Sequence, residues 1–256
     1  MKINYLMLSL IIIIAVSTSA LAVPTQITVR VKAKDAQFIG TSMGGVMITI
    51  KNAQTGELLA KGKTSGDAGS TERIMITPLS HGEPMSDESA AKFTATIDID
   101  EPVLVEVDAY GPLKPQLSAN RASVTQWVVP GKNIIGGDAW LMEIPGFAVH
   151  VQAPTTNIVL AGVPHAVKIY AHVIMMCGCP ITPGGLWDAN KIEVAVLLVK
   201  NNKRIGILPL QYDGSASQFS GTWNVQEPGI YKATVYAYDA SNGNTGLDST
   251  TFTVAP

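Results

Sequence analysis

The sequence has little of what enzymes and nucleic-acid-binding proteins usually rely on. Charged residues make up 15% of the chain, the formal net charge is −2, and no basic stripe is present, so we expect no nucleic-acid partner. The metalloprotease motif H-E-x-x-H and a phosphate-binding glycine loop are both absent. The chain has only four histidines, and no complete catalytic constellation accompanies them. We therefore expect a protein that binds and does not catalyse.

The first 22 residues predict export. Lys2 precedes an apolar run over residues 6–16, and small residues follow, ending in Ala20-Leu21-Ala22. A basic start, a short apolar core and an A-x-A site are typical of a cleavable signal peptide, so we expect cleavage after Ala22. The alternative is an uncleaved anchor, because residues 3–23 approach the ~20 residues that a spanning helix needs. Cleavage would leave a periplasmic or cell-surface protein with no transmembrane segment.

Helical periodicity is nearly missing, whereas alternating β-branched runs occur throughout. The 23 glycines and 15 prolines suit short strands joined by tight turns, and a hydrophobic content of 46% argues against disorder. The alternation predicts strands at residues 26–34, 46–52, 57–63, 73–79, 92–99, 103–110, 123–129, 139–143, 147–152, 157–160, 166–176, 192–200, 204–210, 218–225, 230–239 and 249–254. The fold class is therefore all-β.

The length suits two sandwiches of roughly 100 residues each. A short polar stretch with a proline, residues 153–157, follows a predicted strand and is typical of a linker. We therefore expect a signal peptide over residues 1–22, one β-sandwich over residues 23–153 and a second over residues 154–256.

The first half carries a hairpin signal. Residues 46–60 read V-M-I-T-I-K-N-A-Q-T-G-E-L-L-A, and residues 64–69 read T-S-G-D-A-G. Gly56 is expected to take a positive φ in the turn. This stretch of about 30 residues resembles the transthyretin-like or carboxypeptidase-regulatory-like module, in which such a hairpin and a T-d-x-x-G turn recur. The resemblance implies a small noncatalytic sandwich.

The end of the chain resembles the last hairpin of bacterial Ig-like domains. Residues 228–239 read P-G-I-Y-K-A-T-V-Y-A-Y-D, and a polar turn and the strand T-T-F-T-V follow. Tyr231 lies where a tyrosine corner would be, with its hydroxyl bonded to the preceding loop. Ala233 stands in place of the cysteine of antibody domains. The resemblance implies an Ig-like sandwich serving adhesion, spacing or partner binding.

Cys177-Gly178-Cys179 contains the only cysteines, at the exit of an apolar strand into a Pro/Gly-rich loop. An oxidising compartment favours a disulfide between them. A straight strand would hold the two Cβ atoms too far apart, and Gly178 permits the kink that closes the gap. Such a small ring would be easily reduced, which makes it a candidate redox centre.

Two further interpretations of this segment stay open. Thiolates of Cys177 and Cys179 with Met175 or Met176 are soft ligands that suit Cu(I), and His172 lies nearby in the sequence. In the third interpretation the sulfurs are inert core atoms. No cofactor other than copper is expected.

The chain is thus predicted to be an exported noncatalytic module of the cell envelope that docks another envelope protein or cell-surface component. One alternative is a copper-binding or thiol-redox accessory protein that uses Cys177 and Cys179. A second is a carbohydrate-binding module, in which Trp127, Trp140 or Trp223 would stack on sugar rings if exposed.

Overall fold

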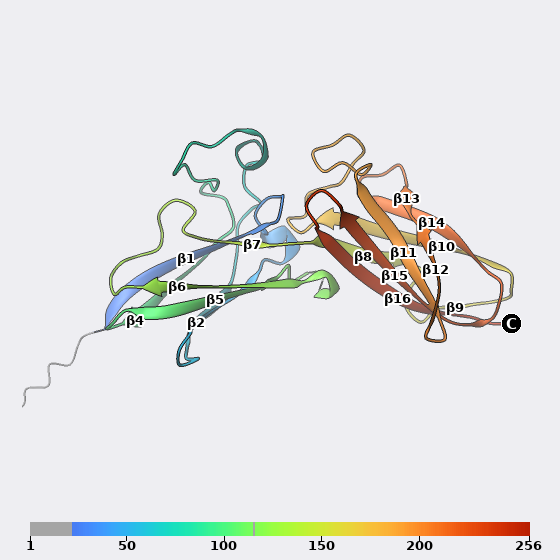
Figure 1. Cartoon of the computed structure of the whole chain (residues 1–256), viewed down its shortest axis with the longest axis horizontal. Coiled ribbons are helices and arrows are strands. Elements are labelled where there is room, and N and C mark those ends of the chain that lie inside the picture. Colours follow the sequence, from blue (N-terminus) through green and yellow to red (C-terminus); the bar gives the residue numbers. More distant parts are fainter. Residues whose placement is uncertain (1–21, 115) are drawn as a thin grey trace, which may run out of the picture.

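A computed structural model describes residues 22–114 and 116–256 and shows a nearly all-β protein of two sandwiches placed end to end (Figure 1). The expected all-β fold of tandem sandwiches is confirmed. The predicted signal peptide, apart from its last residue, lies outside the described residues. No helix in the described ranges is long and apolar enough to span a membrane.

The elements follow one another along the chain with two short 3-10 helices and one short π-helix among the strands. In order they are β1 (Val23–Ala33), η1 (Thr41–Met43), β2 (Met47–Asn52), β3 (Leu58–Lys63), η2 (Glu72–Ile76), β4 (Phe93–Ile99), β5 (Val103–Gly111), η3 (Gln116–Ser118), β6 (Asn120–Val128), β7 (Trp140–Ile144), β8 (Phe147–Ala153), β9 (Val159–Leu160), β10 (His165–Met175), β11 (Ile192–Lys200), β12 (Lys203–Pro209), β13 (Gln211–Tyr212), β14 (Gln218–Val225), β15 (Gly229–Asp239) and β16 (Thr245–Val254).

The first sandwich packs the sheet β4-β1-β7 against the sheet β3-β2-β5-β6. Alternation explains the packing, because Ile48 and Ile50 of β2 point into the core while Thr49 between them does not. The β2–β3 turn forms as predicted, with Gly56 at φ 76°. Asn52 Oδ1 accepts the backbone N–H groups of Gln54 and Thr55 in that turn.

The strand predicted at residues 73–79 is wrong. The segment forms the π-helix η2 and an extended continuation, and its backbone bonds are local, from Ile74 N to Ser70 O and from Thr77 N to Glu72 O. Ile74 packs on Phe38 in a small satellite core outside the sheet. Neither sheet offers this segment a pairing partner among the described strands, so only Ile74 packs inward while Ile76 stays exposed.

The second sandwich packs the sheet β13-β14-β10-β8 against the sheet β12-β11-β15-β16-β9. The predicted tyrosine corner is confirmed, because the buried Tyr231 donates its hydroxyl to Glu227 O at 2.6 Å. The Tyr231 ring stacks on Phe252, with ring centroids 5.5 Å apart. This corner ties the start of β15 to the loop before it, as in Ig-like domains.

The expected division at residues 153/154 needs a correction of strand assignment. The expected boundary places residues 147–152 in the first sandwich, but β8 pairs antiparallel with β10, from Phe147↔Met175 to Ala153↔Tyr170. Strand pairing therefore passes from one sandwich to the other between Ile144 and Phe147, before the proline-containing stretch. Pro154 follows an outer strand of the second sandwich and does not link the two units.

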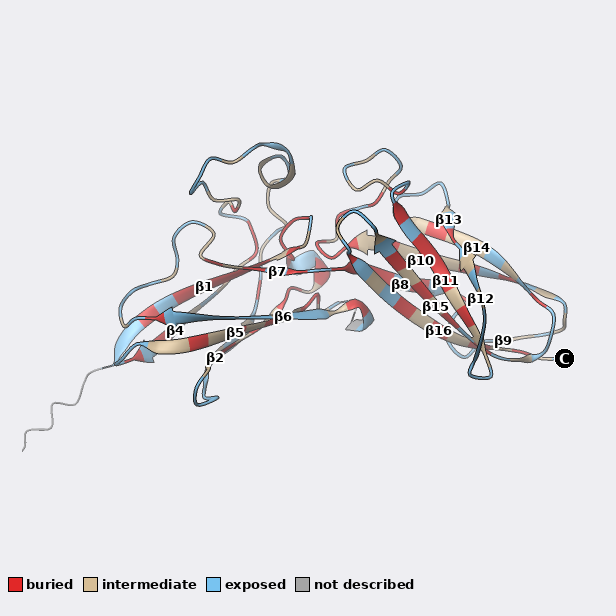
Figure 2. Cartoon of the chain, in the orientation of Figure 1, coloured by how far each residue is buried: buried red, intermediate tan, exposed pale blue. Residues whose placement is uncertain are grey.

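Polar contacts and a shared core join the sandwiches. Trp187 Nε1 donates to Asp35 O at 2.9 Å, Asn242 Nδ2 donates to Asp35 Oδ2 at 3.0 Å, and Lys34 Nζ donates to Asn242 O at 2.6 Å. Buried residues line the inner faces of both sandwiches and form one continuous cluster across the junction (Figure 2). The junction therefore fixes how loops of the two sandwiches meet.

Candidate functional site

The Cys177–Cys179 segment lies against the first sandwich. The two sulfur atoms are 2.12 Å apart, a disulfide distance, and Gly178 has a φ of 88°, which supplies the kink. Cys177 is 2% exposed and Cys179 is 6% exposed. Cys179 Sγ lies 3.0 Å from the side-chain oxygen of Gln37 in the first sandwich. The neighbouring sandwich therefore covers the pair, whereas a copper or redox site would need it exposed.

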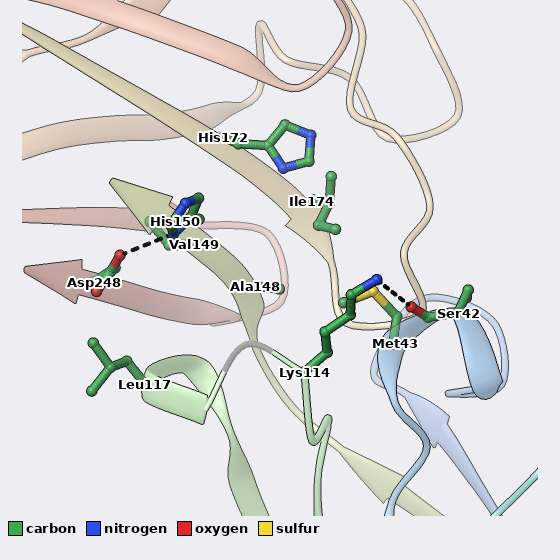
Figure 3. A pocket seen from close by; sticks show the side chains of 10 residues that line it. All are labelled: Ser42, Met43, Lys114, Leu117, Ala148, Val149, His150, His172, Ile174 and Asp248. Atoms are coloured by element: carbon green, nitrogen blue, oxygen red, sulfur yellow. Dashed lines mark hydrogen bonds and ion pairs between the residues drawn. The ribbon is translucent and has the colours of Figure 1, made fainter. Parts of the chain in front are cut away.

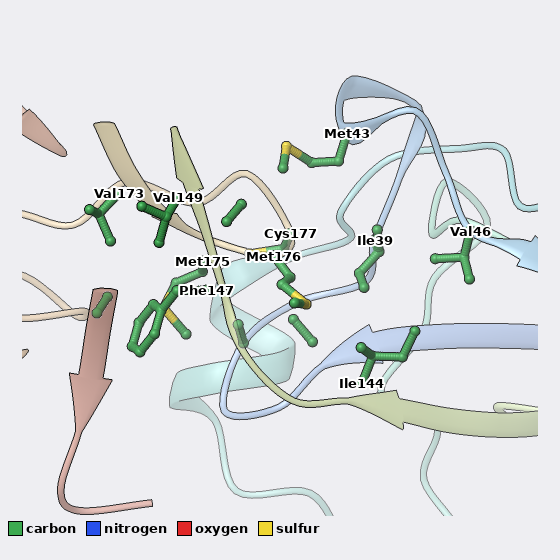
Figure 4. Close-up of a cluster of buried hydrophobic side chains, with 14 of the residues drawn as sticks. Ile39, Met43, Val46, Ile144, Phe147, Val149, Val173, Met175, Met176 and Cys177 are labelled. Carbon is green, nitrogen blue, oxygen red and sulfur yellow. The ribbon is translucent and has the colours of Figure 1, made fainter. Parts of the chain in front are cut away.

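The two methionines next to the pair are core residues. Met175 and Met176 are both fully buried. Figure 4 shows Met176 and Cys177 among the apolar side chains at the junction, near Ile39 and Met43 of the first sandwich. A Cβ atom on Gly146 would lie only 2.6 Å from Met176 Cε, so the thioether fills the junction tightly.

His172 is separated from the cysteines. It lies on the outer face of β10, paired with His150 of β8, whereas the sulfurs are buried beyond the end of β10. In the described ranges no group of three or more His, Cys, Asp and Glu side chains is arranged to hold a metal ion. The five predicted metal ligands are thus not brought together as one set, and copper binding stays a prediction.

A cleft of about 620 Å³ opens where the two sandwiches meet (Figure 3). Its second-sandwich wall is the outer face of β8 and β10. The residues lining the cleft are Ser42, Met43, Lys114, Leu117, Ala148, Val149, His150, His172, Ile174 and Asp248. The cleft therefore combines an apolar surface with a few polar groups, as ligand and peptide sites do.

Electrostatics in the cleft favour a neutral His172. Burial lowers the pKa of His172, and the neighbouring His150 lowers that pKa further. His150 Nδ1 lies 3.7 Å from Asp248 Oδ2, whose oxygens also accept the N–H groups of Val151 and Ser249. Asp248 is therefore held by the backbone of its own sandwich, and His172 presents an uncharged imidazole to the cleft.

Residues 40–44, G-T-S-M-G, match the nucleophile pattern G-x-S-x-G, a signal that the sequence-based prediction passed over. Ser42 lines the same cleft as His150, His172 and Asp248. The pattern requires a strand–turn–helix elbow, whereas Ser42 lies in the three-residue helix η1. No hydrogen bond joins the Ser42 hydroxyl to either imidazole among the described residues, so the set lacks the contacts of a catalytic triad.

β6 is the open edge of the sheet β3-β2-β5-β6. Ala53 N, directly after β2, donates to Leu104 O, so the backbone groups of the even-numbered residues of β5 point toward β2. Backbone groups of successive residues point to opposite sides of a strand, so the odd-numbered residues of β5 bond β6. Their partners on β6 are the even-numbered residues. The backbone N–H and C=O groups of Ser123, Thr125 and Trp127 therefore point away from β5, toward the open edge.

The side chains of β6 do not protect this edge. Seven of its nine residues are exposed, and no charged residue or proline occurs after Arg121. Edge strands are normally protected by charges, prolines or bulges, because unpaired backbone groups recruit other strands. Trp127, 57% exposed at the end of β6, adds an aromatic anchor of the kind enriched at binding hot spots.

The three tryptophans considered for sugar stacking differ in exposure. Trp140 is buried in β7, and Trp223 is half-buried and packs over Gly206. Trp127 alone among these three presents its ring to solvent. A stacking role, if the chain has one, therefore falls to Trp127.

No family model and no curated protein matches the chain. Among solved structures it is similar to fibronectin(III)-like modules of Clostridium thermocellum CbhA, at 15% identity over 90% of this chain and 85% of that chain, with a TM-score of 0.30. Titin Ig tandem domains are 12% identical over 91% and 96%, with a TM-score of 0.24. An engineered protein is 17% identical over 50% of this chain and 24% of that chain, with a TM-score of 0.33. These similarities are too remote to bear on function.

Proposed function

We propose that this chain is an exported, noncatalytic module of the cell envelope that docks another envelope protein, and that β6 receives an extended strand of that partner. The observation that carries the proposal is the open β6 edge, with the backbone groups of Ser123, Thr125 and Trp127 unpaired by β5. Strand addition supplies main-chain hydrogen bonds for affinity and side-chain contacts for specificity.

The chemistry of the edge indicates what the partner strand looks like. The exposed outer-face residues Ser123, Thr125 and Trp127 are uncharged, and Trp127 lies opposite Leu104 on β5. A partner strand with an apolar or aromatic residue opposite Trp127 and small polar residues opposite Ser123 would match this face. A few residues carry most of the binding free energy at protein interfaces, so Trp127 would contribute most of the affinity.

The decisive variant is Thr125→Pro. Proline removes the N–H that points to the open edge and leaves the bonds between β5 and the even-numbered residues of β6 in place. A photo-crosslinking amino acid at Ser123, in the cells that export the protein, is expected to give one discrete adduct. Mass mapping should place that adduct on an extended segment of the partner, and Thr125→Pro should abolish it.

Two controls make the experiment specific. Thr125→Ala keeps the backbone N–H and should keep the adduct, and the same crosslinker at the exposed Thr222 of β14 should give none. Thr125→Pro must retain the thermal midpoint of the parent protein, which shows that the sheet is intact. An adduct that survives in a folded Thr125→Pro protein, or no adduct from Ser123, contradicts strand addition.

The exposed Trp127 ring favours the carbohydrate-binding alternative as a second candidate function. Trp127→Ala distinguishes the two, because sugar stacking depends on the ring whereas strand addition also depends on the Thr125 N–H. Loss of polysaccharide retention in Trp127→Ala with full retention in Thr125→Pro would favour the sugar. The thiol-redox alternative requires a reductant to reach the sulfurs of Cys177 and Cys179. These residues are only 2% and 6% exposed, so the junction between the sandwiches would have to open first.

A further inference from the structure

Strand pairing brings two histidines together at the cleft between the sandwiches. His150 of β8 and His172 of β10 stand directly opposite each other in the antiparallel pair of these strands. Opposite residues project to the same face of a sheet, and both histidines line the cleft. Figure 3 shows both rings at the cleft wall. The fold therefore holds two imidazoles on one face of the sheet.

The register places the two histidines at short range. The backbone N–H groups of Val149 and Val151 bond to side chains at the open edge of β8, so the backbone groups of His150 point toward β10. In such a hydrogen-bonded pair the Cα atoms are about 5.5 Å apart, and the Cβ atoms about 4.5–5.5 Å apart. The His150 side chain is 68% exposed, so its ring has room to turn toward that of His172. One ion at the metal–nitrogen distance of about 2.0–2.1 Å can then contact both rings.

The charges around the pair favour a cation. Asp248 Oδ2 lies 3.7 Å from His150 Nδ1. Figure 3 shows Lys114, the lysine of the cleft, at the far end from Asp248. A carboxylate near an imidazole favours positive charge there, and metal-binding histidines commonly have such a group at their other ring nitrogen. Nε2 of His150 is therefore the nitrogen left for an ion.

Two imidazole nitrogens define the class of ion. Imidazole suits Zn²⁺, Ni²⁺ and Cu²⁺, whereas Ca²⁺ and Mg²⁺ take oxygen ligands. Among these ions Cu²⁺ binds a given set of nitrogen donors most tightly, and it prefers a tetragonal arrangement that two adjacent imidazoles and water complete. No group of three or more His, Cys, Asp and Glu side chains in the described part of the chain is arranged for a metal, so an ion here keeps open coordination positions.

We propose that His150 and His172 bind one Cu²⁺ ion in the cleft, with the remaining coordination positions open to water or to a donor group of a molecule in the cleft. The site is separate from Cys177 and Cys179, whose sulfurs are joined in a buried disulfide and offer no thiolate. It is also independent of β6 and of the docking proposal.

The test adds copper(II) chloride to the full chain at neutral pH and records pulsed EPR spectra, with glycine as a weak competing chelator that keeps copper off isolated histidines. The signal should saturate at one Cu²⁺ per chain and show modulation from two imidazoles. His150→Asn and His172→Asn should each leave at most one imidazole in the signal and weaken Cu²⁺ binding by about tenfold or more, a factor that corresponds to about 1.4 kcal/mol. His81→Asn, which changes an exposed loop histidine, is the matched control and should alter neither the modulation nor the affinity.

Three outcomes overturn the proposal. One is a parent spectrum without two-imidazole modulation, and another is modulation that persists unchanged in His150→Asn, which would place the ion on other histidines. The third is displacement of Cu²⁺ by an excess of Ca²⁺, which would show that carboxylates hold the ion. Since His150 is largely exposed, His150→Asn is expected to keep the thermal midpoint of the parent protein. The test therefore remains decisive even if replacement of the half-buried His172 disturbs the fold.

Discussion

Ser118 and Val149 are bonded to each other in both directions, although one belongs to the first sandwich and the other to the second. Ser118 Oγ accepts the backbone N–H of Val149 at 2.9 Å and donates to its carbonyl oxygen at 3.1 Å. Both residues are buried. One hydroxyl thus substitutes for a strand neighbour at the edge of β8, where the sheet β13-β14-β10-β8 ends.

Ser118→Ala should therefore destabilise the protein. The substitution leaves the buried N–H and C=O of Val149 without their hydrogen-bond partner, which lowers the free energy of unfolding by about 1–3 kcal/mol. Urea denaturation of the full chain measures the change. Ser123→Ala, at an exposed position of β6, is the matched control and should change the free energy of unfolding by less than about 0.5 kcal/mol. Equal midpoints for the two variants would contradict the role of Ser118.

A fragment that keeps β8 should be more stable than one that does not. β8 pairs with β10 along its whole length and buries Phe147, Val149 and Val151. A fragment of residues 146–256 is expected to unfold cooperatively, whereas residues 154–256 expose the edge of β10 and the apolar face that β8 covers. Circular dichroism during thermal unfolding compares them. If residues 154–256 unfold at the same temperature as the longer fragment, β8 is dispensable for the second sandwich.

The stability of the protein should fall as pH drops below the ordinary histidine value of 6.5, in part because of His172. Its folded-state pKa is lowered by burial, so in this pH range the unfolded chain binds more protons than the folded chain. The contribution is fully present above pH 6.5 and is lost as the pH falls toward the lower folded-state pKa. The neighbouring His150 also opposes the protonation of His172 in the folded protein.

His172→Gln measures this contribution. The variant should lose less stability than the parent between pH 7 and pH 5, compared by urea midpoints at each pH. His81→Gln, which changes an exposed histidine in a loop, is the matched control for the loss of an imidazole. If the His172→Gln and parent curves run parallel, another group carries the acid sensitivity.

Features that depend on local alternation could be predicted from the sequence. The period of two in β2 and β15 places Ile48, Ile50 and Tyr231 in the core, and the glycine of the first hairpin needs no distant partner. The hydroxyl bond of Tyr231 is also local, since Glu227 precedes it by four residues. These predictions succeed because each relies on neighbours close in the chain.

Features set by distant segments could not be predicted. The burial of Cys179 depends on Gln37, 142 residues away, and the sequence around the cysteines contains no sign of that neighbour. The alternation in the sequence predicts an exposed Arg30, but in the structure the segment that ends at Ala91 covers it. Likewise β8 follows the first sandwich in the chain but finds its partner in β10, because pairing depends on the available sheet edge.

The disulfide should be resistant to reduction in the folded protein. Thiol–disulfide exchange requires the attacking thiolate to reach a sulfur, and Cys177 and Cys179 are both buried at the junction between the sandwiches. Treatment with a thiol reductant and an alkylating agent, followed by intact mass measurement, should leave the native chain unmodified. The same treatment in denaturant should add two alkyl groups. Rapid double alkylation of the native chain would show that the junction opens and would restore the thiol-redox function as a candidate.

Ser118→Ala, which weakens the junction nearby, should accelerate native alkylation, whereas Ser123→Ala should not.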